Sequence, residues 1–316
     1  LAKEFEHISV ICLERGSHNL PGNVKVHSLG KEGGESRLKY LRRFFSFIFH
    51  MRREYDGVFV HMNPEYVILG GLFWRIWKKR VVMWYNHTYG TWRSTLAMKL
   101  AHIVCHTSPY AFTAGTKKSL RMPAGIDARV FNINQGVARV SSSILYLGRI
   151  APVKGVHTLI SAAKILAENH AKFILDICGE ASPHHEEYKK SIEKEVVEDI
   201  KESKTFFEWR LRFWDLPILH REAVKVFQTH EFFVNLTPAG NYDKTVLEAM
   251  ACGTIPVVSS KAFADILTEE FRFEEGNPED LARALERNLA RPPEERKQIG
   301  ERFSKYVKDT HDLKLL

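Results

Sequence analysis

The feature that most constrains the fold is an alternation of short apolar runs with amphipathic stretches, which occurs twice along the chain. In the first half, six apolar runs predict strands: HISVICLE, VKVHSL, GVFVHM, RVVMWYNH, IVCHTS and LRMPAG. Between them, the helical spacing of apolar residues predicts helices over residues 36–54, 64–77 and 92–101. Strands that alternate with helices of this length indicate a parallel sheet joined by crossover helices.

A polar segment, residues 131–142, precedes a second round of the same alternation. This round predicts strands over 143–148, 173–179, 231–237 and 254–260, and helices over 155–169, 186–202, 244–252 and 277–290. A length of 316 residues suits two domains of ordinary size, so we predict α/β domains over residues 1–133 and 134–316. Ligands of open α/β sheets bind at the carboxyl ends of the strands, and the expected site is the cleft between the two domains.

The net charge of +8 is distributed unevenly. Residues 1–135 hold 20 Lys and Arg against 9 Asp and Glu, a net charge of +11, whereas residues 136–316 hold 26 against 29, a net charge of −3. Such asymmetry indicates an anionic partner for the first half, either nucleic acid or a membrane surface. Because no recognised nucleic-acid motif accompanies the charge, we expect an anionic membrane surface and no nucleic acid.

Two segments of the first half interleave cations with aromatic rings, residues 37–55 (RLKYLRRFFSFIFHMRREY) and residues 73–85 (FWRIWKKRVVMWY). This composition suits a helix that lies in the interface of a membrane. The structural alternative is an ordinary amphipathic helix whose apolar side faces the core. One set of residues has the spacing that this alternative requires: Leu38, Leu41, Phe45, Ile48 and Phe49.

Several kinds of protein and of site are disfavoured by what the sequence lacks. No apolar stretch approaches the ~20 residues of a membrane-spanning helix, and the opening LAKEFEHISV is not a signal peptide. The four cysteines form no CxxC or Cys/His cluster, so we expect no metal site. The absence of GxGxxG and GxxxxGK[ST] disfavours nicotinamide and Walker-type nucleotide sites. We expect a cytoplasmic protein, with peripheral attachment to the inner face of a membrane as an open alternative.

The first segment that carries chemistry is SILYLGRIAPVKGVHTLISA, in which a buried strand ends at Gly148 and Arg149 follows. A short loop then leads to Lys154 and the start of a helix. Two cations thus lie at the carboxyl end of a strand, beside a helix N-terminus whose amides also favour anions. A diphosphate would fit this position; the alternative is a surface loop with two solvated cations.

The second segment is NLTPAGNYDKTVLEAMACGTIPVVSS, in which a strand leads through a loop to Asp243 and a helix that carries Glu248. Asp243 is either a functional carboxylate or only the N-cap of this helix. Glu248 follows Lys244 by one turn, so a surface ion pair is one interpretation. The helix is otherwise apolar, however, and a carboxylate on a buried helix needs a partner, which two ribose hydroxyls would supply.

The third segment is VVMWYNHTYGTWRS, in which a strand ends in Asn86, His87 and Thr88. A histidine at the carboxyl end of a strand, beside the expected cleft, is a candidate functional residue. The alternative is that His87 has a structural role.

These segments together resemble a retaining glycosyltransferase with the GT-B fold, of the large group 1 family (glycosyltransferase family 4). The resemblance is carried by LYLGRIAPVKG, DKTVLEAMACGTIPVV and, before the second domain, MPAGIDARVF. It is strong over residues 143–168 and 231–260 and weaker in the first half. The fold that it implies consists of two Rossmann-like α/β domains that face each other across a cleft, with the nucleotide-sugar donor on the second domain.

The resemblance also implies roles for individual residues. Arg149 and Lys154 match the cations that hold the donor diphosphate, and Glu248 matches the second glutamate of the E-x7-E motif, which binds the nucleotide ribose. His87 matches a histidine placed near the transferred sugar. The implied donor site is Gly148, Arg149, Lys154, Tyr242, Asp243, Lys244, Thr245 and Glu248, with base contacts from main chain near residues 206–209. The implied catalytic residues are His87, Arg149, Lys154 and Asp243.

The sequence departs from the family pattern at one motif position. Gly240 stands where the first glutamate of E-x7-E is expected. Asp243 is one candidate to replace that carboxylate, and weakened or lost activity is the alternative. We also expect the family's first strand and its glycine loop, which approaches the diphosphate, to be missing from this chain.

The activity that the resemblance implies is sugar transfer with retention, from a UDP- or GDP-sugar to a lipid-linked or polysaccharide acceptor of the cell envelope. Fixed cations can stabilise the departing diphosphate, and no DxD-type acidic pair stands in a suitable loop, so we expect neither a metal nor another cofactor. The main alternative is a nucleotide-sugar-binding relative with weakened catalysis. Epimerases and phosphorylases of the same fold remain possible, but the combination of Arg149, Lys154 and Glu248 fits the group 1 family better.

Overall fold

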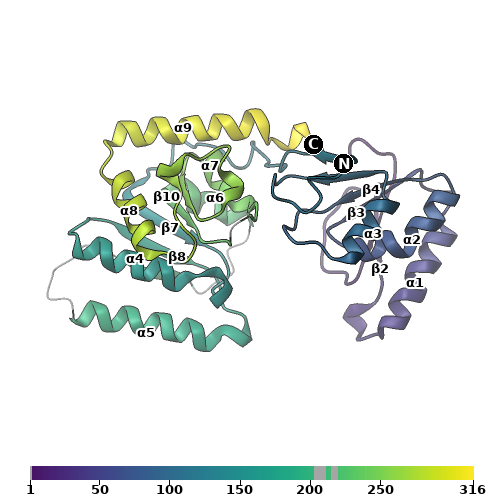
Figure 1. Cartoon of the computed structure of the whole chain (residues 1–316), viewed down its shortest axis with the longest axis horizontal. Helices are drawn as coiled ribbons and strands as arrows, with labels where there is room; N and C mark the ends of the chain where they lie inside the picture. The colour runs from purple at the N-terminus through teal and green to yellow at the C-terminus, as the bar shows by residue number, and fades with distance from the viewer. Residues whose placement is uncertain (1, 203–210, 215–219, 239) are drawn as a thin grey trace. The chain divides into compact units, whose positions relative to one another are not determined.

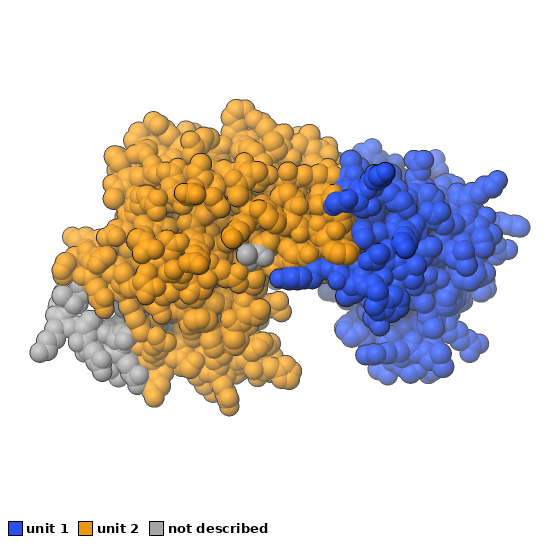
Figure 2. All heavy atoms as spheres, in the orientation of Figure 1, with its two compact units in different colours: residues 1–85, 89–105, 115–120 blue, residues 86–88, 106–114, 121–316 orange. Residues whose placement is uncertain are grey.

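The computed structural model describes residues 2–202, 211–214, 220–238 and 240–316. By packing, the chain divides into two compact units (Figure 2): unit 1 is residues 1–85, 89–105 and 115–120, and unit 2 is residues 86–88, 106–114 and 121–316. The domain boundary expected between residues 133 and 134 falls within unit 2. The two units are groups of residues that pack together and do not by themselves define domain boundaries, so the expected boundary stays a prediction.

Unit 1 is built on strands that form two sheets. Strands β1 (Ile8–Cys12) and β2 (Val24–Ser28) pair with each other in parallel. The second sheet has the order β3 (Gly57–His61), β4 (Arg80–Trp84), β5 (Ile103–His106) and β6 (Ser119–Arg121), and its pairings β3–β4 and β4–β5 are parallel. In the described part of the chain, β1 and β3 therefore each have a strand neighbour on one side only.

Three helices complete unit 1 (Figure 1): α1 (Arg37–His50), α2 (Pro64–Ile76) and α3 (Trp92–Leu100). Each starts at a residue suited to that position. The Ser36 side chain caps α1, Pro64 is the first residue of α2, and Thr91 forms a capping box at the start of α3.

The aromatic residues of α1 pack mainly against α2. The ring centroid of Phe44 lies 5.1 Å from that of Tyr66 and 6.2 Å from that of Trp74. The Phe49 ring lies 5.0 Å from Phe73. Most of the rings in this basic segment therefore form a helix–helix contact.

The core face of α1 differs from the predicted one. Ile48 is buried as expected, but Leu38 is 75% exposed and Phe49 is 37% exposed. Phe44, which the predicted stripe omits, is buried. The prediction is wrong for Leu38 because this residue lies in the first turn, ahead of the turns that carry the rings against α2.

Unit 2 contains one five-stranded sheet with the order β11-β10-β7-β8-β9, and all of its pairings are parallel. Its strands are β7 (Val140–Leu147), β8 (Ile174–Cys178), β9 (Leu211–Trp214), β10 (His230–Asn235) and β11 (Ile255–Val258). Its helices (Figure 1) are α4 (Val156–Glu168), α5 (Glu186–Glu202), α6 (His220–Thr229), α7 (Lys244–Ala251), α8 (Pro278–Leu289) and α9 (Pro293–Thr310).

The order of these strands fixes where a ligand can bind. The chain runs from β7 through β8 to β9 on one side and then crosses to β10 on the other side of β7. The switch point of the sheet thus lies between β7 and β10, and ligands of such sheets bind outside the carboxyl ends of the strands there. The loops that follow β7 and β10 are the ones that the sequence analysis singled out.

The predicted fold class, mixed α/β with parallel sheets, is confirmed. The strong sequence signals also fall on the expected elements: α4 lies within residues 155–169, and α7 within residues 244–252. Among the described residues, none of the helices combines the length and the apolar character needed to cross a membrane.

Candidate functional site

The loop after β7 is held against the loop after β8. The Gly148 amide donates to the Cys178 carbonyl at 3.0 Å, and the Ile150 amide donates to the Glu180 carbonyl at 2.9 Å. A Cβ at Gly179 would lie only 1.8 Å from the Gly148 carbonyl oxygen, so the close approach of the two loops depends on glycine there. The backbone around Arg149 is thus fixed by its neighbours.

Arg149 has an exposed side chain on this fixed backbone. The buried Tyr146 hydroxyl donates to the Arg149 carbonyl at 2.9 Å. Burial raises the pKa of Tyr146, so its hydroxyl keeps its proton and remains a donor. A guanidinium held out from a rigid loop is available to an anion at the carboxyl edge of the sheet.

Lys154 lies at the end of the same loop, directly before α4. It closes a short 3-10 turn, and Gly155 follows with φ of 63°, the left-handed conformation that glycine adopts most easily. The half-buried Lys154 ammonium donates to the Thr237 hydroxyl at 3.4 Å. This contact brings the loop after β7 together with the loop after β10.

Asp243 is the N-cap of α7, and each of its carboxylate oxygens accepts two hydrogen bonds. Oδ1 accepts from the Thr245 amide at 3.2 Å and from the Thr245 hydroxyl at 2.9 Å. Oδ2 accepts from the Asn235 amide group at 3.2 Å and from the Thr237 hydroxyl at 2.9 Å. A carboxylate offers about four acceptor positions, so these bonds use its capacity. The geometry is that of the N-cap alternative.

The ionisation of Asp243 follows from these contacts. Burial alone would raise its pKa, but the hydrogen bonds from Thr245, Thr237 and Asn235, together with the Lys154 charge, outweigh burial and lower the pKa below its ordinary value. Asp243 is therefore a half-buried carboxylate that stays ionised, and Thr237 lies between it and the Lys154 ammonium.

The other predicted donor residues of α7 differ in exposure. Glu248 is only 5% exposed, which argues against the surface ion pair with Lys244, whose side chain is exposed. Thr245 is half-buried beside Asp243. The structure thus joins Lys154, Asp243 and Thr245 through direct or shared hydrogen bonds and places Glu248 on the same short helix.

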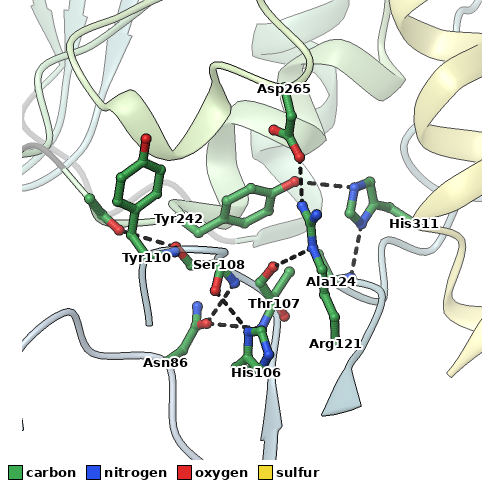
Figure 3. A network of polar contacts seen from close by, with 11 residues as sticks. Asn86, His106, Thr107, Ser108, Tyr110, Arg121, Ala124, Tyr242, Asp265 and His311 are labelled. Atoms are coloured by element: carbon green, nitrogen blue, oxygen red, sulfur yellow. Dashed lines mark hydrogen bonds and ion pairs between the residues drawn. The ribbon is translucent and has the colours of Figure 1, made fainter. Parts of the chain in front are cut away.

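The Tyr242 side chain points into the interior of unit 2 (Figure 3). Its ring stacks on Phe263 at 4.4 Å between centroids, and its hydroxyl lies 3.1 Å from Nε2 of His311. His311 Nδ1 accepts from the Ala124 amide at 3.1 Å, so Nε2 carries the proton and donates to Tyr242. Any contact of Tyr242 with a donor would therefore come from its main chain.

His87 lies in one of the short segments that pack with unit 2, and its side chain is exposed. Its carbonyl accepts from the Phe112 amide at 2.8 Å. The neighbouring Asn86 accepts hydrogen bonds through Oδ1 from the amides of Thr107 and Ser108, both at 2.9 Å (Figure 3). The segments 86–88 and 106–114 are thus tied to each other by specific bonds.

Asn86 and Ser108 are residues whose part in the site the sequence analysis misses. Both residues stand at the ends of predicted strands, Asn86 in RVVMWYNH and Ser108 in IVCHTS. The only sign of their role in the sequence is that each is a polar residue directly after an apolar strand. Such residues are common in loops, and most of them simply face solvent, so this sign does not identify a contact.

Gly240, in the loop between β10 and α7, contacts both segments 86–88 and 106–114. The Ser108 hydroxyl donates to the Gly240 carbonyl at 3.2 Å. Gly240 has φ of 92°, and a Cβ there would lie 2.6 Å from the Thr88 Cγ2 atom. The space that a glutamate side chain would need at position 240 is therefore filled by the Thr88 methyl group.

No metal centre is evident in the parts of the chain that the structure describes: no group of three or more His, Cys, Asp or Glu side chains there is arranged to hold an ion. The expected base contacts near residues 206–209 lie outside the described residues.

The comparisons with known proteins bear on what this site serves. A family model described as glycosyl transferases group 1 matches residues 136–306, more than half of the chain. The chain belongs to this family of glycosyltransferases. The match covers Gly148, Arg149, Lys154 and the whole of α7, which is where the sequence resemblance is strongest. A search of curated proteins found no match.

Solved glycosyltransferase structures share the architecture of this enzyme. Sucrose-phosphate synthase from Thermosynechococcus elongatus aligns with a TM-score of 0.75 at 16% identity, over 98% of this chain and 86% of that one. HepE from Anabaena in complex with UDP aligns with a TM-score of 0.72 at 16% identity, over 92% and 82%. A glycosyltransferase from Rickettsia africae gives 0.69 at 15% identity, over 92% and 82%. At these identities the likeness shows the fold, which is GT-B.

Proposed function

We propose that this glycosyltransferase moves a sugar from a UDP- or GDP-sugar to its acceptor with retention of configuration, as in glycosyltransferase family 4, and without a metal. The observation that carries the proposal is the pairing of Arg149 and Lys154 on one rigid loop at the switch point of the unit 2 sheet. The HepE structures with UDP and with UDP-glucose, which share the fold, support a nucleotide-sugar donor.

The proposed chemistry depends on stabilising negative charge. When the bond between the sugar and the phosphate breaks, charge develops on the departing diphosphate. Arg149 and Lys154 supply fixed positive charge there, and the amides at the start of α7 add to it. The acceptor hydroxyl attacks the same face of the sugar carbon, and its proton passes to the departing phosphate oxygen, which preserves the configuration.

The remaining donor residues have roles that follow from their contacts. Glu248 would accept hydrogen bonds from ribose hydroxyls, and His87 would lie near the transferred sugar. Gly148 and the main chain of residues 242–245 would line the phosphates. Asp243 would act through Thr237, which it holds against Lys154; this is the role that its four hydrogen bonds support.

We also propose that the acceptor is lipid-linked or a cell-envelope polysaccharide, and that unit 1 meets an anionic membrane surface from the cytoplasmic side. Two apolar side chains one turn apart on α2 support this: Leu72 is 59% exposed and Ile76 is 66% exposed. Arg75 and Lys78 beside them are also exposed. An apolar pair flanked by cations suits an anionic lipid surface.

The expected absence of the family's first strand and glycine loop is part of this proposal. Among the described residues, β1 and β3 each have a strand neighbour on one side only, and this supports the proposal. Hydrogen exchange is the test: amides of β3 should exchange faster than those of β7, which pairs on both sides. Equal protection would show that the free side of β3 is already covered.

The alternative is a donor-binding relative with weakened catalysis, and Gly240 is the observation in its favour. Donor consumption separates the two readings. The purified enzyme should release UDP or GDP from one class of sugar nucleotide in the presence of EDTA, faster when an acceptor extract is added. Binding of a donor without any release would favour the alternative, and a requirement for added Mn²⁺ would contradict the proposed metal independence.

A further inference from the structure

Gly240 and the two segments that contact it form one junction, which we call the Gly240 junction: residues 86–88, residues 106–110 and Gly240. A Cβ at position 240 would lie 2.6 Å from Thr88 Cγ2, 3.6 Å from Thr88 Cβ and 3.8 Å from Tyr110 Cβ. Separations under 3.0 Å essentially never occur for real Cβ atoms, so the Thr88 methyl occupies the space that any side chain would need.

Hydrogen bonds hold the junction from the other side. The fully buried Ser108 hydroxyl donates to the Gly240 carbonyl at 3.2 Å and accepts from the Tyr110 amide at 3.1 Å (Figure 3). Asn86 Oδ1 accepts from the amides of Thr107 and Ser108. Both functions of the Ser108 hydroxyl are therefore used, and Asn86 ties the second segment to the first.

His87 stands between two members of this junction in sequence. Asn86 before it binds the amides of Thr107 and Ser108, and Thr88 after it packs on Gly240. The position of His87 is thus set by contacts on both sides. A side chain at position 240 would have to displace the side chain of Thr88, the residue directly after His87.

We propose that Gly240 is a positioning residue: its missing side chain lets Thr88 dock on the α7 loop and so places His87 for sugar transfer. According to this proposal, the enzyme requires glycine at position 240 for activity, and the absence of a glutamate there does not weaken catalysis. The proposal rests on the proposed sugar transfer, and it makes the opposite prediction from the weakened-relative reading for the same substitution, Gly240→Glu.

The test compares four variants with the unchanged enzyme: Gly240→Glu, Gly240→Ala, Thr88→Ser, and the combination of Gly240→Ala with Thr88→Ser. Thr88→Ser removes the methyl group that a Cβ would meet and keeps the hydroxyl. Gly276→Ala is the matched control, because Gly276 also has a positive φ, 73°, but has open space around its Cβ position. It reports the cost of backbone strain alone.

We expect Gly240→Ala and Gly240→Glu to lower kcat at least about tenfold, since small displacements of a positioned group cost this much. The KM for the donor should change little, because Arg149, Lys154 and Glu248 are untouched. Gly240→Ala should cost several-fold less in the Thr88→Ser background than in the unchanged background. Gly276→Ala should leave kcat unchanged.

A readout without turnover keeps the inference separate from the proposed function. In Gly240→Ala the amides of Thr107 and Ser108 should exchange hydrogen faster, and Thr88→Ser should restore their protection. Higher activity in Gly240→Glu would overturn the inference. So would equal exchange in all variants, or a loss in Gly240→Ala that Thr88→Ser fails to reduce. An unchanged enzyme that uses no sugar nucleotide would instead overturn the proposed function.

Discussion

Asp243 shows how one half-buried carboxylate organises the candidate site. Its four hydrogen bonds join the end of β10, the loop after it and the first turn of α7. Through Thr237 it also reaches Lys154, the cation that the donor diphosphate would need. The sequence showed an N-cap or a functional carboxylate at this position, and the contacts show how a cap can serve the site.

Asp243→Ala should lower the free energy of unfolding by more than about 2 kcal/mol, because it removes an N-cap and leaves buried donors on Asn235 and Thr237 without their acceptor. Asp243→Asn, which keeps one oxygen for the cap, should cost less. Urea denaturation measures both. A cost below about 0.5 kcal/mol for Asp243→Ala would contradict the contacts described here.

His311 gives unit 2 a pH-dependent stability. Burial, and secondarily the Arg121 charge, lower its pKa to about 4, while Asp265 acts in the opposite direction. An unfolded histidine has a pKa of ~6.5, so between these values the unfolded chain binds a proton that the folded chain does not. The contribution of His311 is therefore complete above pH ~6.5 and is lost as the pH falls towards 4.

Between pH 7 and pH 5 this linkage should remove about 2 kcal/mol of stability from the unchanged enzyme. His311→Asn should be less stable at pH 7, because it loses the contact with Tyr242, but should lose about 2 kcal/mol less over the same pH interval. Urea denaturation at the two pH values gives the comparison. Parallel losses in the two proteins would mean that His311 does not carry the effect.

The strands and helices were largely readable from the sequence, and the reason is physical. Residues 144–146 of β7 and 232–234 of β10 are buried on both faces and so appear as short continuous apolar runs. α7 has a capping residue at its start and Gly253 after its end. The prediction for Leu38, in the first turn of α1, was wrong. Helical spacing shows which face of a helix is apolar, but it does not show how far along α1 the contact with α2 extends.

α2 also carries the surface on which the membrane proposal rests. The unchanged enzyme should sediment with vesicles that contain about 30% anionic lipid, because the negative surface attracts Arg75 and Lys78. Leu72→Ser combined with Ile76→Ser should abolish this sedimentation. Leu38→Ser removes a still more exposed leucine from α1, 75% against 59% for Leu72, and should not change sedimentation.

If the α2 double variant sediments as the unchanged enzyme does, the membrane contact is elsewhere or absent. Binding to neutral vesicles alone would contradict the part assigned to Arg75 and Lys78. Loss of binding in both variants would show that exposed apolar area in general, and not the α2 pair, is responsible.

At the scale of the whole molecule, the family and the GT-B fold could be predicted from the sequence. The donor-binding roles of Arg149, Lys154 and Glu248 stay predictions. The packing of residues 86–88 and 106–114 with unit 2 could not be predicted, because the Ser108–Gly240 bond joins residues 132 positions apart. The same limit hid the reason for Gly240. A missing glutamate is visible in the sequence, but the methyl group that fills its place is visible only in the fold.

The central claim is that Arg149 and Lys154 form a diphosphate site in unit 2, and thermal unfolding with nucleotides tests it most directly. UDP, GDP and ADP would each be added at one common concentration, about 100 times the dissociation constant of the tightest binder, where that nucleotide stabilises the fold by ~2.7 kcal/mol. The account predicts that UDP or GDP raises the unfolding temperature, that the other nucleotides do so less, and that Arg149→Ala abolishes the shift. No shift with any of the three, or an equal shift in Arg149→Ala, would contradict it.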